Sequence, residues 1–309
     1  DKEKGRIKSL VYKKIELLKE GKGPKPNFWR APTDNDFGNK MHVKNIEWKK
    51  ASLFYKVSKI KIFKLEVGKV LLDIEYTLPG VETTFTSKYT IYGNGIIKIE
   101  NTLNKTSYKG DIPRIGMRMQ LPKKYNDITY FGRGPWENYQ DRNRAAFVDV
   151  YSSKVKDQYV PYIRPQENGY KTNVRWVALS DSNNNGLLVV ANNDQKGLGI
   201  SALHVPNEDF DTCVGLNYNS QTNTDESYQI DGIPEVNSSK HTIDIKQQDL
   251  AQLNIDLEQR GVAGDDSWYS KPQPKYLING DVVHEYSFFL IPFIETNKQN
   301  LINLGKKFK

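Results

Sequence analysis

Cysteine is almost absent from this 309-residue chain, which contains only Cys213. An intrachain disulfide is therefore excluded, and the cysteine count leaves a cytoplasmic and a periplasmic location equally open. Histidine is also scarce, with four well-separated residues, so we expect no metal site built from Cys and His. No stretch approaches the roughly 18 apolar residues of a membrane-spanning helix, and Asp1–Arg6 lacks the apolar core of a signal peptide.

The sequence signatures of several enzyme classes are missing as well. No Gly-rich phosphate loop precedes a helical pattern, and no GxSxG element is present. The net charge is +8, but Lys and Arg are scattered along the chain, so we expect neither nucleic acid nor a membrane as a partner. An aromatic content of 11% can supply a core despite the mean hydropathy of −0.68, which argues against disorder.

Alternation of apolar and polar residues dominates what is present. Residues 70–77 alternate in this way and predict a half-buried strand. Residues 85–91 share the pattern, and the Gly-Asn-Gly sequence at 93–95 then predicts a hairpin turn, because these residues tolerate positive φ. Residues 286–290 predict a late strand. The chain therefore has the pattern of an antiparallel β protein.

Further strands are expected in the second half of the chain. Residues 173–179 and 187–191 predict a second hairpin across the turn at 182–186. Residues 250–257 fit a helix or a strand, and we favour the strand; residues 241–245 are also strand-like. Four long segments rich in Gly, Pro, Asn and Asp separate these patterns, at residues 21–40, 132–144, 159–172 and 261–274. Ordered loops of such length are often functional.

The long loops place aromatic rings beside charged and amide side chains, as carbohydrate sites do. The stretch PNFWRAPTDNDFG at 26–38 is one example. Its composition fits a carbohydrate site and fits equally well a loop whose aromatic rings only pack against the loop itself. Two acidic pairs, Asp34 with Asp36 and Asp265 with Asp266, lie in these loops. Such carboxylates usually accept hydrogen bonds from turn N–H groups, with cation or sugar-hydroxyl binding as the alternative.

Four loop motifs resemble the C-terminal domain, the small-chain or domain 5-like region, of β-galactosidases of glycoside hydrolase family 2. They occur in the family's order, and together they span nearly the whole chain. The matching stretches are FWRAPTDND at 28–36, GRGPWENYQDR at 132–142, YVPY with PQENG at 159–169, and LNID at 253–256 followed by GDDSW at 264–268.

The resemblance implies an all-β fold, a large antiparallel β supersandwich of the galactose-mutarotase-like superfamily. It implies one domain over residues 1–309. The family's domain usually begins with further strand sequence before the position of Asp1, so an edge strand is expected to be missing. Relatives vary after the GDDSW motif, where this chain has Tyr-Ser-Lys-Pro at 269–272, and this leaves the subsite specificity open.

The resemblance also implies a function. The catalytic Glu pair of such retaining glycosidases lies on a separate (β/α)₈ barrel, so we expect no catalytic residue, metal or cofactor in this chain and no activity of the chain alone. The parent enzyme, with Mg or Na as its candidate ions, is expected to hydrolyse terminal β-galactosides as a homo-oligomer. The expected partners are the barrel domain and the β-galactoside or its aglycone, with Trp268 as the substrate-binding residue.

The other candidate residues are expected to order loops or to face the barrel. They include Glu137 and Glu167, whose motifs belong to this domain in the family, so structural hydrogen bonding is the expected role rather than catalysis. The full set is Arg30, Asp34, Asn35, Asp36, Glu137, Asn138, Glu167, Asn168, Asp265 and Asp266. We also expect Trp136 to be at least partly buried, because its loop has no other evident use than packing onto the sandwich.

Two alternatives remain open from the sequence. One is a free-standing mutarotase-like sugar epimerase, which would use His with Glu for proton transfer; none of the four His residues lies in a motif typical of that family. The other is a non-catalytic carbohydrate-binding module. A mutarotation assay and a glycan titration on the isolated domain distinguish the three functions.

Overall fold

The alternating segments of the sequence form two stacked antiparallel sheets. The computed structural model describes residues 1–192, 197–211, 217–219, 224–226, 239, 241–266 and 269–307. The larger sheet has nine strands in the order β10-β9-β12-β13-β18-β7-β6-β5-β4. Their bounds are β4 Lys56–Glu66, β5 Lys69–Leu78, β6 Thr83–Tyr92, β7 Ile97–Leu103, β9 Asp127–Gly134, β10 Phe147–Lys154, β12 Trp176–Ser180, β13 Gly186–Ala191 and β18 His284–Phe293.

The smaller sheet has five strands in the order β11-β14-β17-β8-β3. They are β3 Lys25–Asn27, β8 Arg114–Leu121, β11 Lys171–Val174, β14 Leu198–Leu203 and β17 Ala251–Gln259. Two short hairpins complete the strands, namely β1 Val11–Tyr12 with β2 Ile15–Glu16, and β15 Asn217–Asn219 with β16 Thr224–Glu226. The expected all-β antiparallel sandwich is confirmed.

The core lies between the two sheets because each contributes one apolar face to it. Met117 on β8 and Ile255 on β17 are opposite each other and fully buried. They belong to the same apolar cluster as Ile99 on β7 and Phe288 on β18, which come from the larger sheet. Alternation has a second consequence: the other face of β8 and β17 carries polar and charged side chains, among them Arg114, Arg118 and Asp256.

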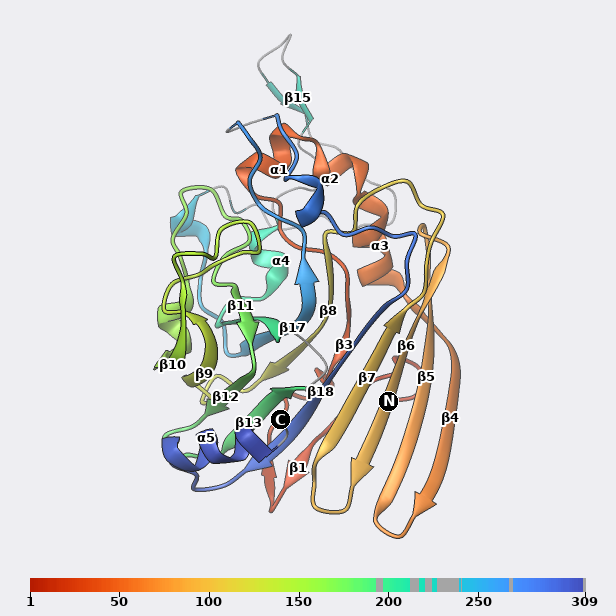
Figure 1. Cartoon of the computed structure of the whole chain (residues 1–309), viewed down its shortest axis with the longest axis vertical. Helices are drawn as coiled ribbons and strands as arrows, with labels where there is room; N and C mark the ends of the chain where they lie inside the picture. Colours follow the sequence, from red (N-terminus) through yellow and green to blue (C-terminus); the bar gives the residue numbers. More distant parts are fainter. Residues whose placement is uncertain are drawn as a thin grey trace.

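Helices close the ends of the sandwich (Figure 1). α1 (Asp34–Gly38), α2 (Met41–Lys44) and α3 (Ile46–Phe54) follow one another at one end, where Trp48 of α3 packs its ring 5.8 Å from that of Phe28. α5 (Lys298–Lys307) lies at the opposite end and covers the outer face of β12 and β13, with Leu301 in an apolar cluster with Trp176. A short helix, α4 (Asn207–Phe210), and the 3₁₀ turns at Val155–Gln158, Thr242–Asp244 and Pro274–Tyr276 lie in the connections.

Most of the strand predictions are confirmed. The 70–77 pattern is β5, the turn at 93–95 joins β6 to β7, and the ambiguous 250–257 pattern is strand β17. The hairpin turn shows the expected geometry, because Gly95 has φ +90° and its N–H donates to the Tyr92 carbonyl.

Three local predictions are wrong in whole or in part. The hairpin across 182–186 is confirmed, because β12 pairs with β13, but its first strand begins only at Trp176. Residues 171–174 instead form β11 of the smaller sheet, with Asn173 at φ +54°, and the chain changes sheet at Arg175. The strand-like residues 241–245 contain a 3₁₀ turn, where Asp244 accepts from the His241 N–H. The expected loop at 21–40 contains β3 and α1, since Thr33 supplies a helix cap.

Candidate functional site

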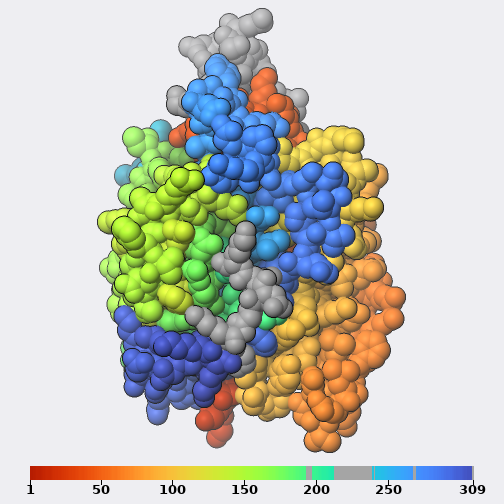
Figure 2. Space-filling view, viewed as in Figure 1, coloured from red at the N-terminus to blue at the C-terminus, as the bar shows by residue number. Residues whose placement is uncertain are grey.

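The loops that carry the sequence motifs meet at one end of the sandwich, around a cavity of about 260 Å³. Of the residues predicted from the sequence, Asp34, Asn35 and Glu167 line it. Its other polar lining residues are Thr33, Arg142, Tyr162 and Gln166, and Tyr139, Val262 and Ala263 complete the wall. Figure 2 shows how segments far apart in sequence adjoin here: the orange-red atoms of α1 lie beside blue atoms of the segment after β17.

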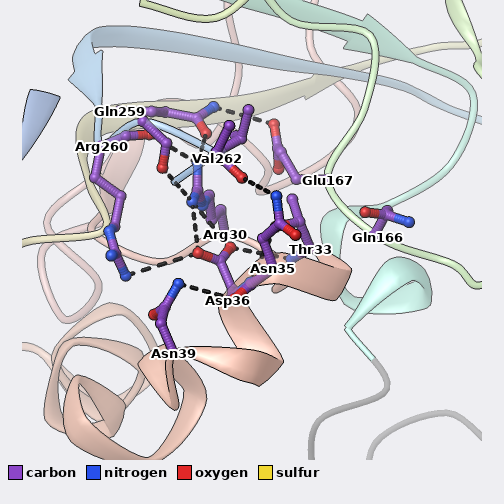
Figure 3. A network of polar contacts seen from close by, with 12 residues as sticks. Arg30, Thr33, Asn35, Asp36, Asn39, Gln166, Glu167, Gln259, Arg260 and Val262 are labelled. Carbon is purple, nitrogen blue, oxygen red and sulfur yellow. Dashed lines mark hydrogen bonds and ion pairs between the residues drawn. The ribbon is translucent and has the colours of Figure 1, made fainter. Parts of the chain in front are cut away.

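A buried ion pair forms the floor below this cavity (Figure 3). The Arg30 Nη2 donates to both carboxylate oxygens of Asp36, at 2.9 and 3.0 Å, and neither side chain reaches solvent. Arg30 also donates to the carbonyls of Arg260 and Gly261, at 2.8 and 3.0 Å. The first motif loop is thereby fastened to the end of β17, because a buried guanidinium must find acceptors for its donors.

Arg260 brings a second buried guanidinium to the same carboxylate. Its Nη1 lies 3.7 Å from Asp36, and its Nε lies 3.4 Å from Asp111. Burial lowers the pKa of Arg260, an effect that Asp36 opposes and Arg30 reinforces. Burial acts to raise the pKa of Asp111, but the charges of Arg260 and Lys271 outweigh it and hold that pKa below its usual value. Asp36 is therefore the carboxylate shared by two arginines.

α1 is short, and a capping box fixes its start. Thr33 accepts from the Asp36 N–H through its hydroxyl, and Asp36 accepts from the Thr33 N–H. The side chain of Asn35 donates to the Val262 carbonyl at 3.2 Å. Gln166 accepts from the Asp34 N–H and donates to the Asp34 carboxylate, at 3.3 and 3.2 Å. These contacts join the first, third and fourth motifs at the cavity.

Glu137 connects the second and third motifs. One of its carboxylate oxygens accepts from Arg142 and from the Tyr162 hydroxyl, and the other accepts from the Gly169 N–H at 2.8 Å. Asn138 is buried beside it and accepts from both the backbone N–H and the hydroxyl of Thr172. These contacts fit the structural role expected for both residues; the absence of a catalytic role for Glu137 stays a prediction.

Glu167 and Asn168 are held in the same way. Glu167 accepts from Arg114 at 2.8 Å and from Gln259 at 3.0 Å. Arg114 places its Nε 2.9 Å from Asp256, so it is shared by two carboxylates in a fully buried position. Burial raises the pKa of Asp256 to about 7. The charge of Arg114 opposes this shift, and the charge of Glu167 adds to it. Asn168 is buried and accepts from the Val160 N–H.

The fourth motif contains the predicted substrate-binding residue, and Trp268 lies outside the described residues. Its neighbour Asp266 accepts from the N–H groups of Tyr269 and Ser270, at 2.8 and 3.0 Å. Asp265 instead accepts from the side chain of Gln273 at 2.6 Å. The prediction that this acidic pair accepts hydrogen bonds from turn N–H groups is therefore confirmed for Asp266. Asp265 instead contacts a side chain eight residues away.

The expected burial of Trp136 is wrong. Trp136 is 80% exposed, whereas the backbone carbonyls of Pro135 and Trp136 accept hydrogen bonds from Tyr130 and Asn138. The turn fixes the backbone of the motif and directs the indole outward. A Trp that follows Gly-Pro in a sequence gives no signal for either orientation.

Several residues of the site were not among the candidates from the sequence. Tyr139, Arg142, Tyr162 and Gln166 lie inside the same motifs, so their position next to the candidates was the available signal. Asp256 ends the LNID stretch and had the same signal, whereas Arg114 and Arg260 come from a strand and a strand end, and nothing local distinguishes them from surface residues. Their burial depends on how the loops cover the sheet.

The described ranges lack two further kinds of feature, a metal site and a membrane-spanning helix. Within these ranges no group of three or more His, Cys, Asp or Glu is arranged to hold a metal ion. No helix among the described residues has the length and apolar character needed to cross a membrane. His204 is buried, and its two ring nitrogens contact the Leu250 carbonyl and the Asn126 amide oxygen at 2.7 and 2.8 Å, so its ring is not paired with a carboxylate.

The sequence comparisons agree with the motifs. The family model described as "Beta galactosidase small chain" matches residues 1–290. A β-galactosidase of Priestia megaterium is 33% identical over 293 residues, which cover 94% of this chain and 25% of that protein. β-Galactosidases of Lactobacillus delbrueckii subsp. bulgaricus and Streptococcus thermophilus are 28% and 26% identical over 95% and 92% of the chain. The chain spans about a quarter of the length of these relatives.

The solved structures that match the chain have low sequence identity and TM-scores below 0.5. A galactose 1-epimerase from Lactobacillus acidophilus matches with a TM-score of 0.41 and 8% identity, over 95% of this chain and 78% of that chain. A family 36 α-galactosidase from Geobacillus stearothermophilus matches with a TM-score of 0.36 and 11% identity, over 78% of this chain and 28% of that chain.

Proposed function

We propose that this chain, which belongs to the β-galactosidase small-chain family, acts as the accessory C-terminal domain of a larger β-galactosidase. In this proposal a separate (β/α)₈ barrel of the parent protein carries the two catalytic carboxylates. The present domain completes the rim of the barrel's active site in the hydrolysis of terminal β-galactosides. The family match and the fourfold greater length of the relatives support a role inside a longer protein.

The observation that carries the proposal is the meeting of all the motif loops around one small polar cavity. Its volume of about 260 Å³ is below the range of about 300–1,000 Å³ that ligand pockets usually have. A cavity of this size, held rigid from below by the Arg30–Asp36 pair, suits part of a binding site whose remaining wall comes from another domain. We therefore place the barrel-facing surface at this cavity.

The lining of the cavity suits sugar hydroxyl groups. The Arg142 guanidinium supplies donors, and the Asp34 carboxylate supplies acceptors. Aromatic stacking on the apolar face of a sugar would come from Trp268, on the resemblance of its motif to the family. In the proposed arrangement the polar residues order the rim, and Trp268 contacts mainly the aglycone side of the substrate.

Substitution of Trp268 in the full-length parent enzyme tests the proposal. Loss of ring stacking worth ~0.5–1.5 kcal/mol corresponds to an increase in KM of about two- to twelvefold for Trp268→Ala. Trp268→Phe should retain most of the affinity, and Trp136→Ala provides a matched control because it removes an exposed indole from a neighbouring loop. Steady-state kinetics with several aryl galactosides, together with transfer to glucose as acceptor, measure the effect.

The two control variants, Trp268→Phe and Trp136→Ala, distinguish the loss of a substrate contact from a general disturbance of the loops. We expect the rate of galactosyl-enzyme formation at saturating substrate to stay within about threefold of wild type in Trp268→Ala, because the bond-breaking carboxylates are elsewhere. If KM and acceptor transfer are unchanged in Trp268→Ala, the proposed substrate contact is wrong. An equal effect of Trp136→Ala would show that the assay reports a general disturbance of the loops.

A further inference from the structure

A second and larger cavity, of about 450 Å³, lies on the polar side of the five-stranded sheet. It shares no lining residue with the cavity of the motif loops. Strands β3, β8 and β17, helix α4 and the N-terminal segment surround it. Five basic side chains and the two carboxylates of Glu208 and Asp209 line it. The basic residues are Arg6, Lys19, Lys22, Lys25 and Arg118.

Two of these cations are held side by side by the sheet itself. Lys25 on β3 is the direct cross-strand partner of Arg118 on β8, so both side chains leave the sheet on the same face. Like charges directly opposite each other destabilise a strand pair. Arg118 is 5% exposed, and its Nε finds no hydrogen-bond partner among the residues that the structure describes. The fold thus maintains an unfavourable pairing at this position.

The carboxylates of the cavity do not neutralise this cluster. Glu208 pairs with Arg118, and Asp209 accepts from Gln248. The charge and hydrogen bond of Arg118 outweigh the effect of burial and lower the pKa of Glu208 to about 2, so this carboxylate is ionised at neutral pH. Within the part of the chain that the structure describes, no hydrogen bond or ion pair reaches the side chain of Arg6, Lys22 or Lys25.

The surrounding charges act most strongly on Lys25. Repulsion from Arg118, together with burial and the charges of Arg6 and Lys22, lowers the pKa of Lys25 to about 7, although Glu208 opposes the shift. Lys25 is therefore only partly protonated at neutral pH. A bound anion would relieve the repulsion and favour the charged form, so anion binding and proton uptake at Lys25 should be coupled.

We propose that this cavity binds a dianionic phosphate group, either free phosphate or the phosphate of a small monoester. Arginine forms paired hydrogen bonds with phosphate oxygens, and lysine supplies a compact charge beside them. The cavity volume lies within the range of about 300–1,000 Å³ typical of small-ligand sites. The amides of Gln120 and Gln252 also line the cavity and can bond further oxygens. This inference is independent of the accessory role proposed above.

Calorimetric titration of the full-length protein with inorganic phosphate tests the proposal. We expect saturable binding that is at least tenfold weaker in Lys25→Met and in Arg6→Gln, because each loses one cation whose side chain has no hydrogen-bond or ion-pair partner among the described residues. Lys61→Met is the matched control, since it removes the same charge from an exposed position on β4, and it should bind phosphate as the wild type does. Circular dichroism of each variant establishes that it is folded.

Sulfate isolates the role of Lys25, because sulfate stays dianionic between pH 6 and pH 8.5. Sulfate affinity of the wild-type protein should rise as the pH falls through about 7, since protonation of Lys25 adds a charge. The rise should be absent in Lys25→Met. If the folded Lys25→Met protein shows the same pH dependence as wild type, Lys25 is not the group that binds the anion.

The two sources of phosphate are distinguished by a third titration with galactose 6-phosphate. Tighter binding of the sugar phosphate than of inorganic phosphate identifies a monoester as the ligand, and weaker binding identifies free phosphate. The proposal is overturned if the full-length protein shows no saturable phosphate binding up to about 20 mM, where ~2.3 kcal/mol would suffice. Equal phosphate affinities of Lys25→Met, Arg6→Gln and Lys61→Met would overturn it as well.

Discussion

The Nη2 atom of Arg30 lies 2.9 and 3.0 Å from the two carboxylate oxygens of Asp36, in an ion pair that solvent does not reach. The pair joins the first motif loop to the end of β17, because the same guanidinium also donates to the Arg260 carbonyl. Asp36 additionally caps α1 through its bond to the Thr33 N–H. One carboxylate thus fixes the helix, the loop and the strand end that form the floor of the candidate site.

Asp36→Asn should strongly destabilise the fold. Removing one partner of a buried pair costs about 3–5 kcal/mol, since the remaining charge is left without compensation. Here two guanidinium groups, Arg30 and Arg260, would lose their common carboxylate. Urea denaturation of the variant measures the loss. Asp34→Asn is the control, because Asp34 is exposed two residues earlier, and its change should stay within about 1 kcal/mol; equal losses in the two variants would contradict the prediction.

Trp136→Ala should leave the stability almost unchanged. The indole is 80% exposed, and substitutions at such surface positions usually change the free energy of unfolding by less than about 0.5 kcal/mol. Trp176→Ala provides the contrast, since that ring is 2% exposed beneath α5 and its truncation should cost about 3–5 kcal/mol. Thermal melts of both variants are the measurement. A marked decrease in the melting temperature for Trp136→Ala would show that the ring packs against the domain.

The raised pKa of Asp256 should make stability depend on pH. The pKa rises from about 3.9 in the unfolded chain to about 7 in the fold, mainly through burial. The folded state therefore binds more protons between these values, and the free energy of unfolding decreases as the pH rises from about 4 to 7. The slope from this group is at most about 1.4 kcal/mol per pH unit.

Asp256→Asn should remove this contribution. The free energy of unfolding is measured for wild type and variant at pH 4.5 and at pH 8. The contribution of Asp256 is the amount by which the difference between the two proteins changes from one pH to the other. Asp281→Asn serves as the control, because Asp281 is exposed. If the difference between wild type and Asp256→Asn is the same at both pH values, Asp256 does not titrate in this range.

The isolated 309-residue chain should not hydrolyse β-galactosides. The motif glutamates Glu137 and Glu167 are each occupied by hydrogen bonds, Glu137 from the Gly169 N–H and Glu167 from Arg114 of β8, and the proposed catalytic pair lies on the barrel. A chromogenic galactoside tests this, with Glu137→Gln and Glu167→Gln as companions. Turnover that either substitution abolishes would contradict the prediction. A mutarotation assay on the same sample tests the epimerase alternative, and a glycan titration tests the binding-module alternative.

The alternating segments determined much of the fold without help from tertiary contacts. The strand at 70–77 and the hairpin around Gly95 followed from local pattern, because period-two alternation and positive φ are properties of neighbouring residues. The order of the loop motifs likewise identified the family before any contact was known. The structure brings all four motif loops to the same cavity, the fourth through Val262 and Ala263.

Tertiary structure decided the features that depend on which residues meet across the sheets. The change of sheet between β11 and β12, the exposure of Trp136 and the burial of Arg114 have no local signal. The pairing of Lys25 with Arg118 joins residues 93 positions apart, and it exists only because β3 and β8 adopt one register. Sequence pattern fixes the conformation of a segment, whereas burial, charge pairing and pKa depend on the segments that cover it, and these come from distant parts of the chain.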